Sequence, residues 1–224
     1  MRAIGLLLWK DVVVEVRARE LVYATVFFAA VVVLVFCFAF LGGPRPTVDV
    51  IAGVLWVTIA LAGTVGISRA FEREREGDTM RALLLAPVPR TALYLSKLTA
   101  ISLLMMIVES VALLMIALLF GVNLGGVVAP LCAFLLLGTI GFAAVAALFG
   151  ASLGRARSRD VLLPLLVYPV VVPVLIAGTR GTVALLVGAE PALATFWLKF
   201  LLVFDAVFVS LGVWVFEPLA AGDA

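Results

Sequence analysis

Long apolar segments without charge dominate this sequence, and short charged segments separate them. The uncharged segments are Leu21 to Pro44, Val50 to Ser68, Ser110 to Gly154 and Val161 to Thr179, and a weaker apolar segment covers Lys199 to Phe216. About 20 apolar residues are enough for one helix to cross the hydrocarbon core of a bilayer. The pattern therefore predicts an integral membrane protein built from helices.

We predict six membrane-spanning helices. The segment that begins at Ser110 is too long for one crossing, and a glycine-rich stretch at 121–126 offers a turn, so this segment completes one helix and supplies another. The predicted helices cover residues 21–42, 48–68, 98–120, 128–153, 161–179 and 198–217. Between Gly178 and Phe196 we predict an outer loop with a short helix after Pro191. The fold class is all-α, with one polytopic transmembrane domain over residues 1–224.

Basic residues are distributed unevenly between the two sides that six crossings create. Six crossings place both termini on one side, and this side carries most of the lysines and arginines. These are Arg2, Lys10, Arg17, Arg19, the six basic residues of the segment 69–97, Arg155, Arg157 and Arg159. Only Arg45, Arg180 and Lys199 are left outside or at the outer edge. By the positive-inside rule, both termini are predicted to be cytoplasmic.

The start of the chain allows a second interpretation, a cleaved signal peptide. The apolar run after Glu20 is longer than the 7 to 15 residues that are typical of such peptides, and no clear small-residue cleavage pattern follows it. The first twenty residues mix leucines and Trp9 with charges, which favours a helix on the cytoplasmic face of the membrane. Val14 to Arg19 alternates like a strand. We prefer the interfacial helix, because an isolated strand would leave its backbone unpaired.

The composition argues against enzymatic chemistry in this chain. The sequence is 65% hydrophobic and 13% charged, and it contains no histidine. No lysine follows a glycine, so the chain has no standard phosphate-binding loop. Cys37 and Cys132 lie alone in different apolar segments, where a single cysteine is usually a small buried hydrophobe. We therefore predict no catalytic residue, no metal site and no cofactor bound by this chain itself.

Residues 69–97 form the most densely charged part of the chain, with ten of its thirty charges. Arg69 to Glu76 reads as the second helix continuing out of the membrane, and Gly77 can end it. Asp78 or Thr79 can then cap a short helix, Met80 to Ala86, which Pro87 and Pro89 stop. Thr91 is predicted to cap the third membrane helix.

This segment is predicted to be a docking loop. The apolar residues Met80, Leu83 and Leu84 must either fold back on the bundle or enter a groove of a partner protein. Four arginines surround them, namely Arg73, Arg75, Arg81 and Arg90. The alternative is a solvated charged loop that only enforces the topology.

Two acids and three prolines interrupt the apolar helices. Glu109 lies near the middle of the third predicted helix and Asp205 in the outer half of the sixth. A charged group at a helix centre costs about 2.5–3.5 kcal/mol or more, so each acid needs a proton or an interhelical bond. The candidate partners are Ser110, Thr139 and Ser210. Either a conduit or hinge, or simple structural bonding, accounts for these acids.

The fifth predicted helix contains Pro164, Pro169 and Pro173. Each proline removes a backbone donor, so this helix should be kinked or thinned. A kinked helix can gate a membrane protein. It is also tolerated where neighbouring groups satisfy the freed carbonyls, which is the interpretation that we favour.

The order of these segments is similar to that of the CcmB family. The resemblance is specific between Gly53 and Lys97, and it rests on Leu55-Trp56, the helix end at 63–69, the Phe-Glu-Arg-Glu run at 71–74 and the LLLAPV sequence at 83–88 with Arg90 and 94–97. The second half of the chain matches chiefly in hydropathy and turn placement.

The resemblance implies a membrane subunit of an ABC-type haem exporter complex for cytochrome c maturation in the bacterial inner membrane. It implies a cytoplasmic ATPase partner, CcmA, which binds the ATP, membrane partners CcmC and CcmD, and the haem chaperone CcmE, with haem handled by the complex. No nucleic-acid partner is expected. A permease of the same fold for another substrate (drug, lipid or polysaccharide) and a non-transporting adaptor are the alternatives. Trp56, Trp197 and Trp214 are expected to pack or to anchor helix ends.

Overall fold

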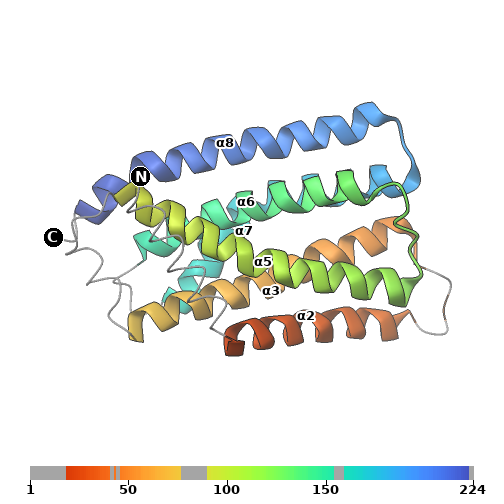
Figure 1. Ribbon diagram of the computed structural model, residues 1–224, viewed down its shortest axis with the longest axis horizontal. Coiled ribbons are helices and arrows are strands. Elements are labelled where there is room, and N and C mark those ends of the chain that lie inside the picture. Colours follow the sequence, from red (N-terminus) through yellow and green to blue (C-terminus); the bar gives the residue numbers. More distant parts are fainter. Residues whose placement is uncertain (1–18, 41–42, 44–45, 77–89, 154–158, 222–224) are drawn as a thin grey trace.

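In the computed structural model, six long helices make up almost all of the described chain (Figure 1). The structure describes residues 19–40, 43, 46–76, 90–153 and 159–221, and these residues contain no β-strand. The helices are α2 (Arg19–Ala39), α3 (Val48–Glu76), α5 (Arg90–Phe120), α6 (Val128–Ser152), α7 (Arg159–Val187) and α8 (Pro191–Ala221). All six are long and apolar enough to cross a membrane. The predicted all-α, polytopic fold is confirmed.

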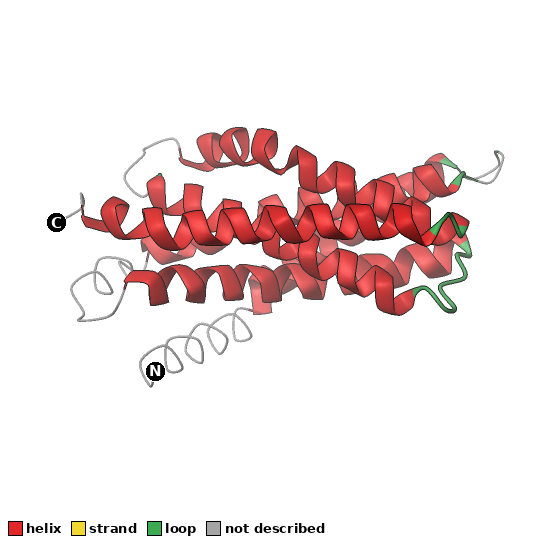
Figure 2. Ribbon diagram, turned by 90° about the horizontal axis from the view of Figure 1, so that it is seen from above, coloured by secondary structure: helices red, strands yellow, loops and turns green. Residues whose placement is uncertain are grey.

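Successive helices run in opposite directions along one axis (Figures 1 and 2). We call the end at which α2 begins and α8 ends the terminal end, and α3 also ends and α5 also begins there. The turns at 121–127 and 188–190 lie at the opposite end, which we call the turn end. Because the number of crossings is even, the start of α2 and the end of α8 lie on the same side.

The helices α3 and α6 form the centre of the bundle. In the most apolar 18 residues of each helix, 67% of the residues in α3 and 72% in α6 are buried, against a third or less in each of the other four helices. The helix α6 packs against α5, α7 and α8, whereas α3 packs against α2, α5 and α7. Small residues on α6, such as Ala143 and Ala146, are fully buried. Such residues allow helices in a membrane to approach closely, since the hydrophobic effect gives little attraction between them there.

The helix α5 begins eight residues before its predicted start at 98, and two expectations change with it. Thr91 lies inside the first turn and does not precede the helix, so its predicted capping role is wrong. Ala92, Leu93 and Tyr94 are buried, which shows that packing against the bundle extends this helix. Lys97, expected in the cytoplasmic segment, is buried at the terminal end of the bundle. A lysine tolerates this because its apolar stem can be buried while the ammonium group reaches polar groups.

The predicted outer loop between Gly178 and Phe196 is wrong. The helix α7 continues through Arg180 to Val187, and α8 begins at Pro191, so that only residues 188–190 connect them. Gly188 has a φ of 69°, its N–H bonds to the Leu185 carbonyl oxygen at 3.3 Å, and the Ala189 N–H bonds to the Ala184 carbonyl oxygen at 2.9 Å. This pair of bonds is the Schellman motif that ends helices at a left-handed glycine.

Other predictions concern the terminal end of the bundle. The continuation of the second helix to Glu76, past the apolar span, is confirmed. The predicted interfacial helix in the first twenty residues falls almost wholly on residues 1–18, and the predicted short helix on 80–86. Both lie outside the described residues and stay predictions.

Candidate functional site

Three arginines of the predicted docking segment lie on described helix ends. Arg73 and Arg75 belong to the last turns of α3, and Arg90 is the first residue of α5. The helix α3 extends eight residues past Ser68, where its apolar span ends, and eight helical residues cover about 12 Å. These arginines therefore lie beyond the apolar spans at the terminal end. The other members of the predicted set lie outside the described residues, namely Met80, Arg81, Leu83 and Leu84.

The two helices that flank this segment are packed tightly against each other. A Cβ added to Gly63 of α3 would lie 2.8 Å from the Met105 methyl group of α5, and one added to Gly66 would lie 2.9 Å from a Leu104 methyl group. The absence of a side chain at these glycines is what permits the close approach. The helices α3 and α5 are therefore in close contact on the terminal side of the bundle.

Glu109 lies on α5 within the membrane-spanning part and is buried at 4% exposure. The Thr139 hydroxyl of α6 donates a hydrogen bond of 2.8 Å to its Oε2 atom. Of the three candidate partners from the sequence, Thr139 is therefore a partner of this acid. The Ser110 hydroxyl instead donates to the Met106 carbonyl oxygen of its own helix at 2.6 Å.

Asp205 lies on α8 and is also buried, but neither of its carboxyl oxygens has a hydrogen-bond partner among the described residues. Its side chain lies against α6, where a Cβ added to Gly141 would be 2.6 Å from Asp205 Oδ1. In α8, which covers Pro191–Ala221, Asp205 is the fifteenth of 31 residues and therefore lies almost at the middle of the helix, at the edge of the half in which it was predicted.

The two acids approach the same short stretch of α6. Thr139, the partner of Glu109, and Gly141, the neighbour of Asp205, are two residues apart, which places them on nearly opposite faces of a helix with 3.6 residues per turn. The helix α6 therefore contacts an acidic side chain on each of two nearly opposite faces at one depth. The sequence shows both acids, but their common depth depends on helix offsets that it does not reveal.

Trp56 of α3 is the largest side chain in the core, with 2% exposure. Its indole ring lies against Gly138 of α6 and Gly178 of α7, where a Cβ at either position would overlap the ring. The ring Nε1–H donates a hydrogen bond of 2.9 Å to the Thr182 hydroxyl of α7. The expectation that Trp56 packs is confirmed, and the two glycines leave the room that its ring occupies.

Two tyrosines make further interhelical contacts. The Tyr94 hydroxyl of α5 lies 3.3 Å from the Ala144 carbonyl oxygen of α6 and 3.4 Å from the Phe208 carbonyl oxygen of α8. The Tyr168 hydroxyl of α7 lies 3.1 Å from the Thr64 hydroxyl of α3. Hydroxyl groups thus join the helices at several depths, where water is not at hand to satisfy them.

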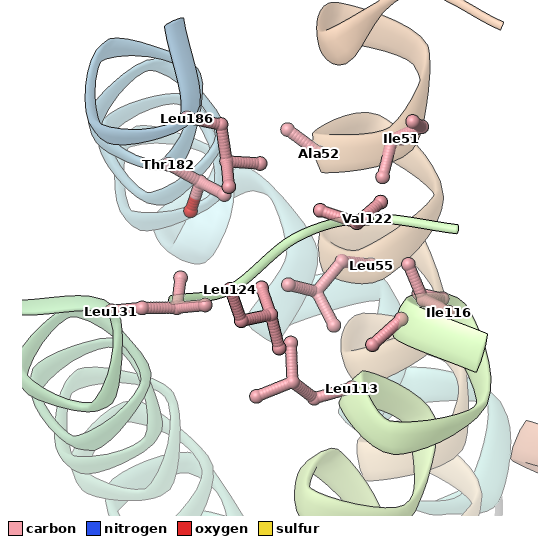
Figure 3. Close-up of a pocket in the computed structure, with 11 residues that line it drawn as sticks. Ile51, Ala52, Leu55, Leu113, Ile116, Val122, Leu124, Leu131, Thr182 and Leu186 are labelled. Carbon is pink, nitrogen blue, oxygen red and sulfur yellow. The ribbon is translucent and has the colours of Figure 1, made fainter. Parts of the chain in front are cut away.

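Two small apolar pockets lie between the helices. The turn-side pocket, shown in Figure 3, is lined by residues of α3, α5, α6, α7 and the 121–127 turn. Its lining residues are Ile51, Ala52, Leu55, Leu113, Ile116, Ala117, Val122, Leu124, Leu131, Thr182 and Leu186. The terminal-side pocket is lined by Thr64, Ile67, Phe142, Ala146, Leu163, Pro164 and Val167. Each measures about 10 Å³, which is room for one water molecule at most.

Comparison with known proteins decides what kind of membrane protein this bundle is. A family model described as CcmB protein matches residues 2–221. The chain belongs to the CcmB family. A curated relative from Pseudomonas aeruginosa, named Heme exporter protein B, is 30% identical over 187 residues, which is 81% of this chain and 81% of the relative. The family match covers all six helices, so it confirms the resemblance beyond the stretch from Gly53 to Lys97 in which the motifs are specific.

Proposed function

We propose that this chain is the membrane subunit of an ABC-type haem exporter complex for cytochrome c maturation. The observation that carries the proposal is the CcmB family match over residues 2–221, together with a relative named Heme exporter protein B. The six-helix bundle supports it, because a transport subunit must span the membrane. ATP is hydrolysed by the partner subunit CcmA, not by this chain.

The ATPase acts on the terminal end of the bundle through the segment 69–97. Leu83 and Leu84 of the predicted short helix 80–86 enter a groove on CcmA, and Arg81 and Arg90 pair with acids at its rim. The two helices that carry this segment, α3 and α5, are packed closely along glycines. ATP-driven motion therefore reaches the centre of the bundle through α3, which is one of its two buried helices.

The remaining partners act within the membrane and at its outer side. CcmC and CcmD are neighbouring membrane subunits, and CcmE is the chaperone that receives the haem. The chain has no histidine, which supports binding of haem by other members of the complex. The terminal end of the bundle faces the cytoplasm, and the protein resides in the bacterial inner membrane.

The docking segment is tested by the double substitution Leu83→Ala with Leu84→Ala. Truncation of two central contacts should cost a few kcal/mol of docking. We expect normal membrane insertion, loss of CcmA in copurification from native membranes and loss of cytochrome c maturation. The matched control is Leu118→Ala with Leu119→Ala, a second leucine pair that is exposed on α5 at the turn end. This control should keep both activities.

Each outcome of this experiment has a clear meaning. If the Leu83/Leu84 variant still binds CcmA at the wild-type level, the segment is not the docking site. If no ATPase copurifies even with the wild-type chain, the adaptor alternative is correct. If an ATPase copurifies but haem delivery and cytochrome c maturation do not depend on this chain, the complex exports another substrate.

A further inference from the structure

The ring of Trp56 fills the space in which three helices meet. It comes from α3, contacts Gly138 of α6 and Gly178 of α7, and is almost completely buried. Glycine at both contact positions leaves room for the ring, and a larger residue at either one would displace it. The ring therefore packs directly against the backbones of α6 and α7 at these glycines and fills the space between them and α3 at this depth.

The two pockets lie on either side of this ring along the same three helices. On α3, the residues that line the turn-side pocket end at Leu55, and those that line the terminal-side pocket begin at Thr64. Leu55 and Thr64 are nine positions apart, which is about 14 Å along the helix, and Trp56 belongs to the layer between them, next to the turn-side pocket. All residues that line the two pockets are uncharged, and α3, α6 and α7 contribute to both, whereas α5 and the 121–127 turn also line the turn-side pocket. We call the contact zone of α3, α6 and α7 that contains both pockets the seam.

Few polar contacts hold α3 and α7 together across this seam. Trp56 donates to Thr182 at 2.9 Å, and the Tyr168 hydroxyl lies 3.1 Å from the Thr64 hydroxyl and 3.4 Å from the Ala60 carbonyl oxygen. Interhelical hydrogen bonds between side chains in membranes are individually weak. Opening of the seam would therefore break only weak polar interactions between α3 and α7.

The helix α7 is weakened on the terminal side of the Trp56 contact. Pro164, Pro169 and Pro173 donate no backbone hydrogen bond, so the carbonyl groups four residues before them lose their helical partners. Gly178 and Thr182, which hold the indole, follow this stretch. Leu163 and Val167, which line the terminal-side pocket, belong to it. The proline-rich half of α7 can thus bend away from α3 while the half at the turn end stays in place.

We propose that Trp56 is a gate residue in an apolar path along α3, α6 and α7, closed in this structure. When α7 bends at its prolines, the indole leaves Gly138 and Gly178, and the two pockets join. The path takes a largely apolar molecule, because among the residues that line the two pockets only Thr64 and Thr182 carry a polar side-chain group. The inference rests on the proposed function in that the ATPase supplies the motion.

The gate is tested first in the complex by ¹⁹F NMR. Trp9, Trp197 and Trp214 are replaced by phenylalanine, so that 5-fluorotryptophan labels only position 56, and the labelled chain is reconstituted in nanodiscs with unlabelled ATPase. We expect one resonance without nucleotide, and a second resonance during ATP turnover that a water-soluble paramagnetic agent broadens. A single, unbroadened resonance in a complex that is hydrolysing ATP overturns the gate and leaves the proposed function intact.

A second test uses the isolated chain, so it does not depend on the ATPase. Ala60→Cys, one turn from Trp56 towards the terminal end, is made in a Cys37→Ala/Cys132→Ala chain and treated with a small impermeant thiosulfonate from the turn end. Trp56→Ala should raise the labelling rate about tenfold, which is equivalent to about 1.4 kcal/mol. Trp214→Ala removes an exposed tryptophan and is the matched control.

A third variant keeps the ring and removes only its bond. Thr182→Val should give a smaller increase in the labelling rate, and it serves as the test if Trp56→Ala does not fold. Equal labelling rates in Thr182→Val, Trp56→Ala and the Trp214→Ala control would mean that the indole does not separate the pockets, and the gate would be wrong. Absence of ATPase binding with increased labelling would contradict the proposed function and leave the gate supported.

Discussion

Glu109 and Asp205 are buried on opposite sides of α6, but only Glu109 has a hydrogen-bond donor among the described residues. A buried carboxyl group is tolerated in a membrane when it is bonded or neutral. The two acids therefore place different demands on the bundle. Glu109 joins α5 to α6 through a defined bond, whereas Asp205 depends on being kept neutral or on a small displacement of α8.

Substitutions at Glu109 should separate bonding from charge. Glu109→Gln keeps an oxygen that can accept from Thr139, so assembly and cytochrome c maturation should be normal. Glu109→Lys places an unmatched cation beside Thr139 and should impair both. Thr139→Val removes the donor and should lower the free energy of unfolding by about 0.6–1.7 kcal/mol, as measured by denaturation in detergent. Equal tolerance of Gln and Lys would show that the side chain faces water.

Gly141 is the position at which the packing around Asp205 can be tested. In Gly141→Ala, the added methyl group would lie 2.6 Å from Asp205 Oδ1 and 3.2 Å from the Phe204 ring, so α8 must move away. We expect a loss of about 1–3 kcal/mol from overpacking. The matched control is Gly53→Ala, where nothing lies within 4 Å, and there the better helix propensity of alanine should stabilise by up to about 1 kcal/mol. Unfolding of both variants in detergent measures the difference, and equal stabilities would show that α6 and α8 are not in contact at this depth.

At the scale of the elements, two helices end at glycines at the turn end. Gly121 ends α5 with a φ of 65°, and the Val122 N–H bonds to the Ala117 carbonyl oxygen at 3.1 Å. Gly188 ends α7 in the same manner. In both cases the glycine lets the chain reverse within a few residues, so that the next helix begins close to the previous one.

Substitution of Gly188 should show what this helix end contributes. A left-handed conformation costs an alanine about 1–2 kcal/mol, so Gly188→Ala should lower the thermal stability of the purified protein. Gly188→Asn should lower it less, because asparagine adopts this conformation more readily. If alanine and asparagine are tolerated equally, α7 ends elsewhere in the membrane-embedded protein.

The sequence predicts the existence of each helix better than its ends. Hydropathy alone shows six helices because each must cover the bilayer, and the charged continuation of α3 to Glu76 follows from the absence of a breaker. The extension of α7 is missed because Arg180 interrupts the apolar run, although an arginine near a membrane surface is compatible with a helix. Gly178 and Gly188 can both end a helix, and the sequence alone does not show which of them ends α7.

The candidate site is predictable in part, because the sequence shows the polar residues of each helix but not how the helices are offset against one another. The apolar surroundings of Glu109 and Asp205 in the sequence show that each acid is buried in the membrane at a cost in free energy. Thr139 is among three partners that the sequence allows. Which of the three is used depends on the offset between α5 and α6, which the chain does not encode locally. The contact of Trp56 with Gly138 and Gly178 joins three helices that are distant in sequence, so no local pattern reveals it.

At the scale of the whole molecule, the bundle has one charged end and one compact end. The two helices that carry the predicted docking segment lead from the terminal end into the bundle, and the short connections 121–127 and 188–190 lie at the turn end. In the function that we propose, force arrives at one end of the bundle and its effect is needed at the other, and this asymmetry supports that proposal. The direction in which the bundle is inserted is therefore central to the proposed function.

Insertion direction is tested by cysteine accessibility in intact cells, in a Cys37→Ala/Cys132→Ala chain. The basic residues concentrate at the terminal end, so the positive-inside rule places that end in the cytoplasm. Cysteines at Arg75 and Arg157 should react only after the inner membrane is made permeable, whereas cysteines at Thr47 and Ala189 should react with an impermeant reagent from outside. Labelling of Arg75→Cys from outside would reverse the orientation. An ATPase in the cytoplasm could then not reach the segment 69–97, and the coupling proposed for α3 and α5 would be wrong.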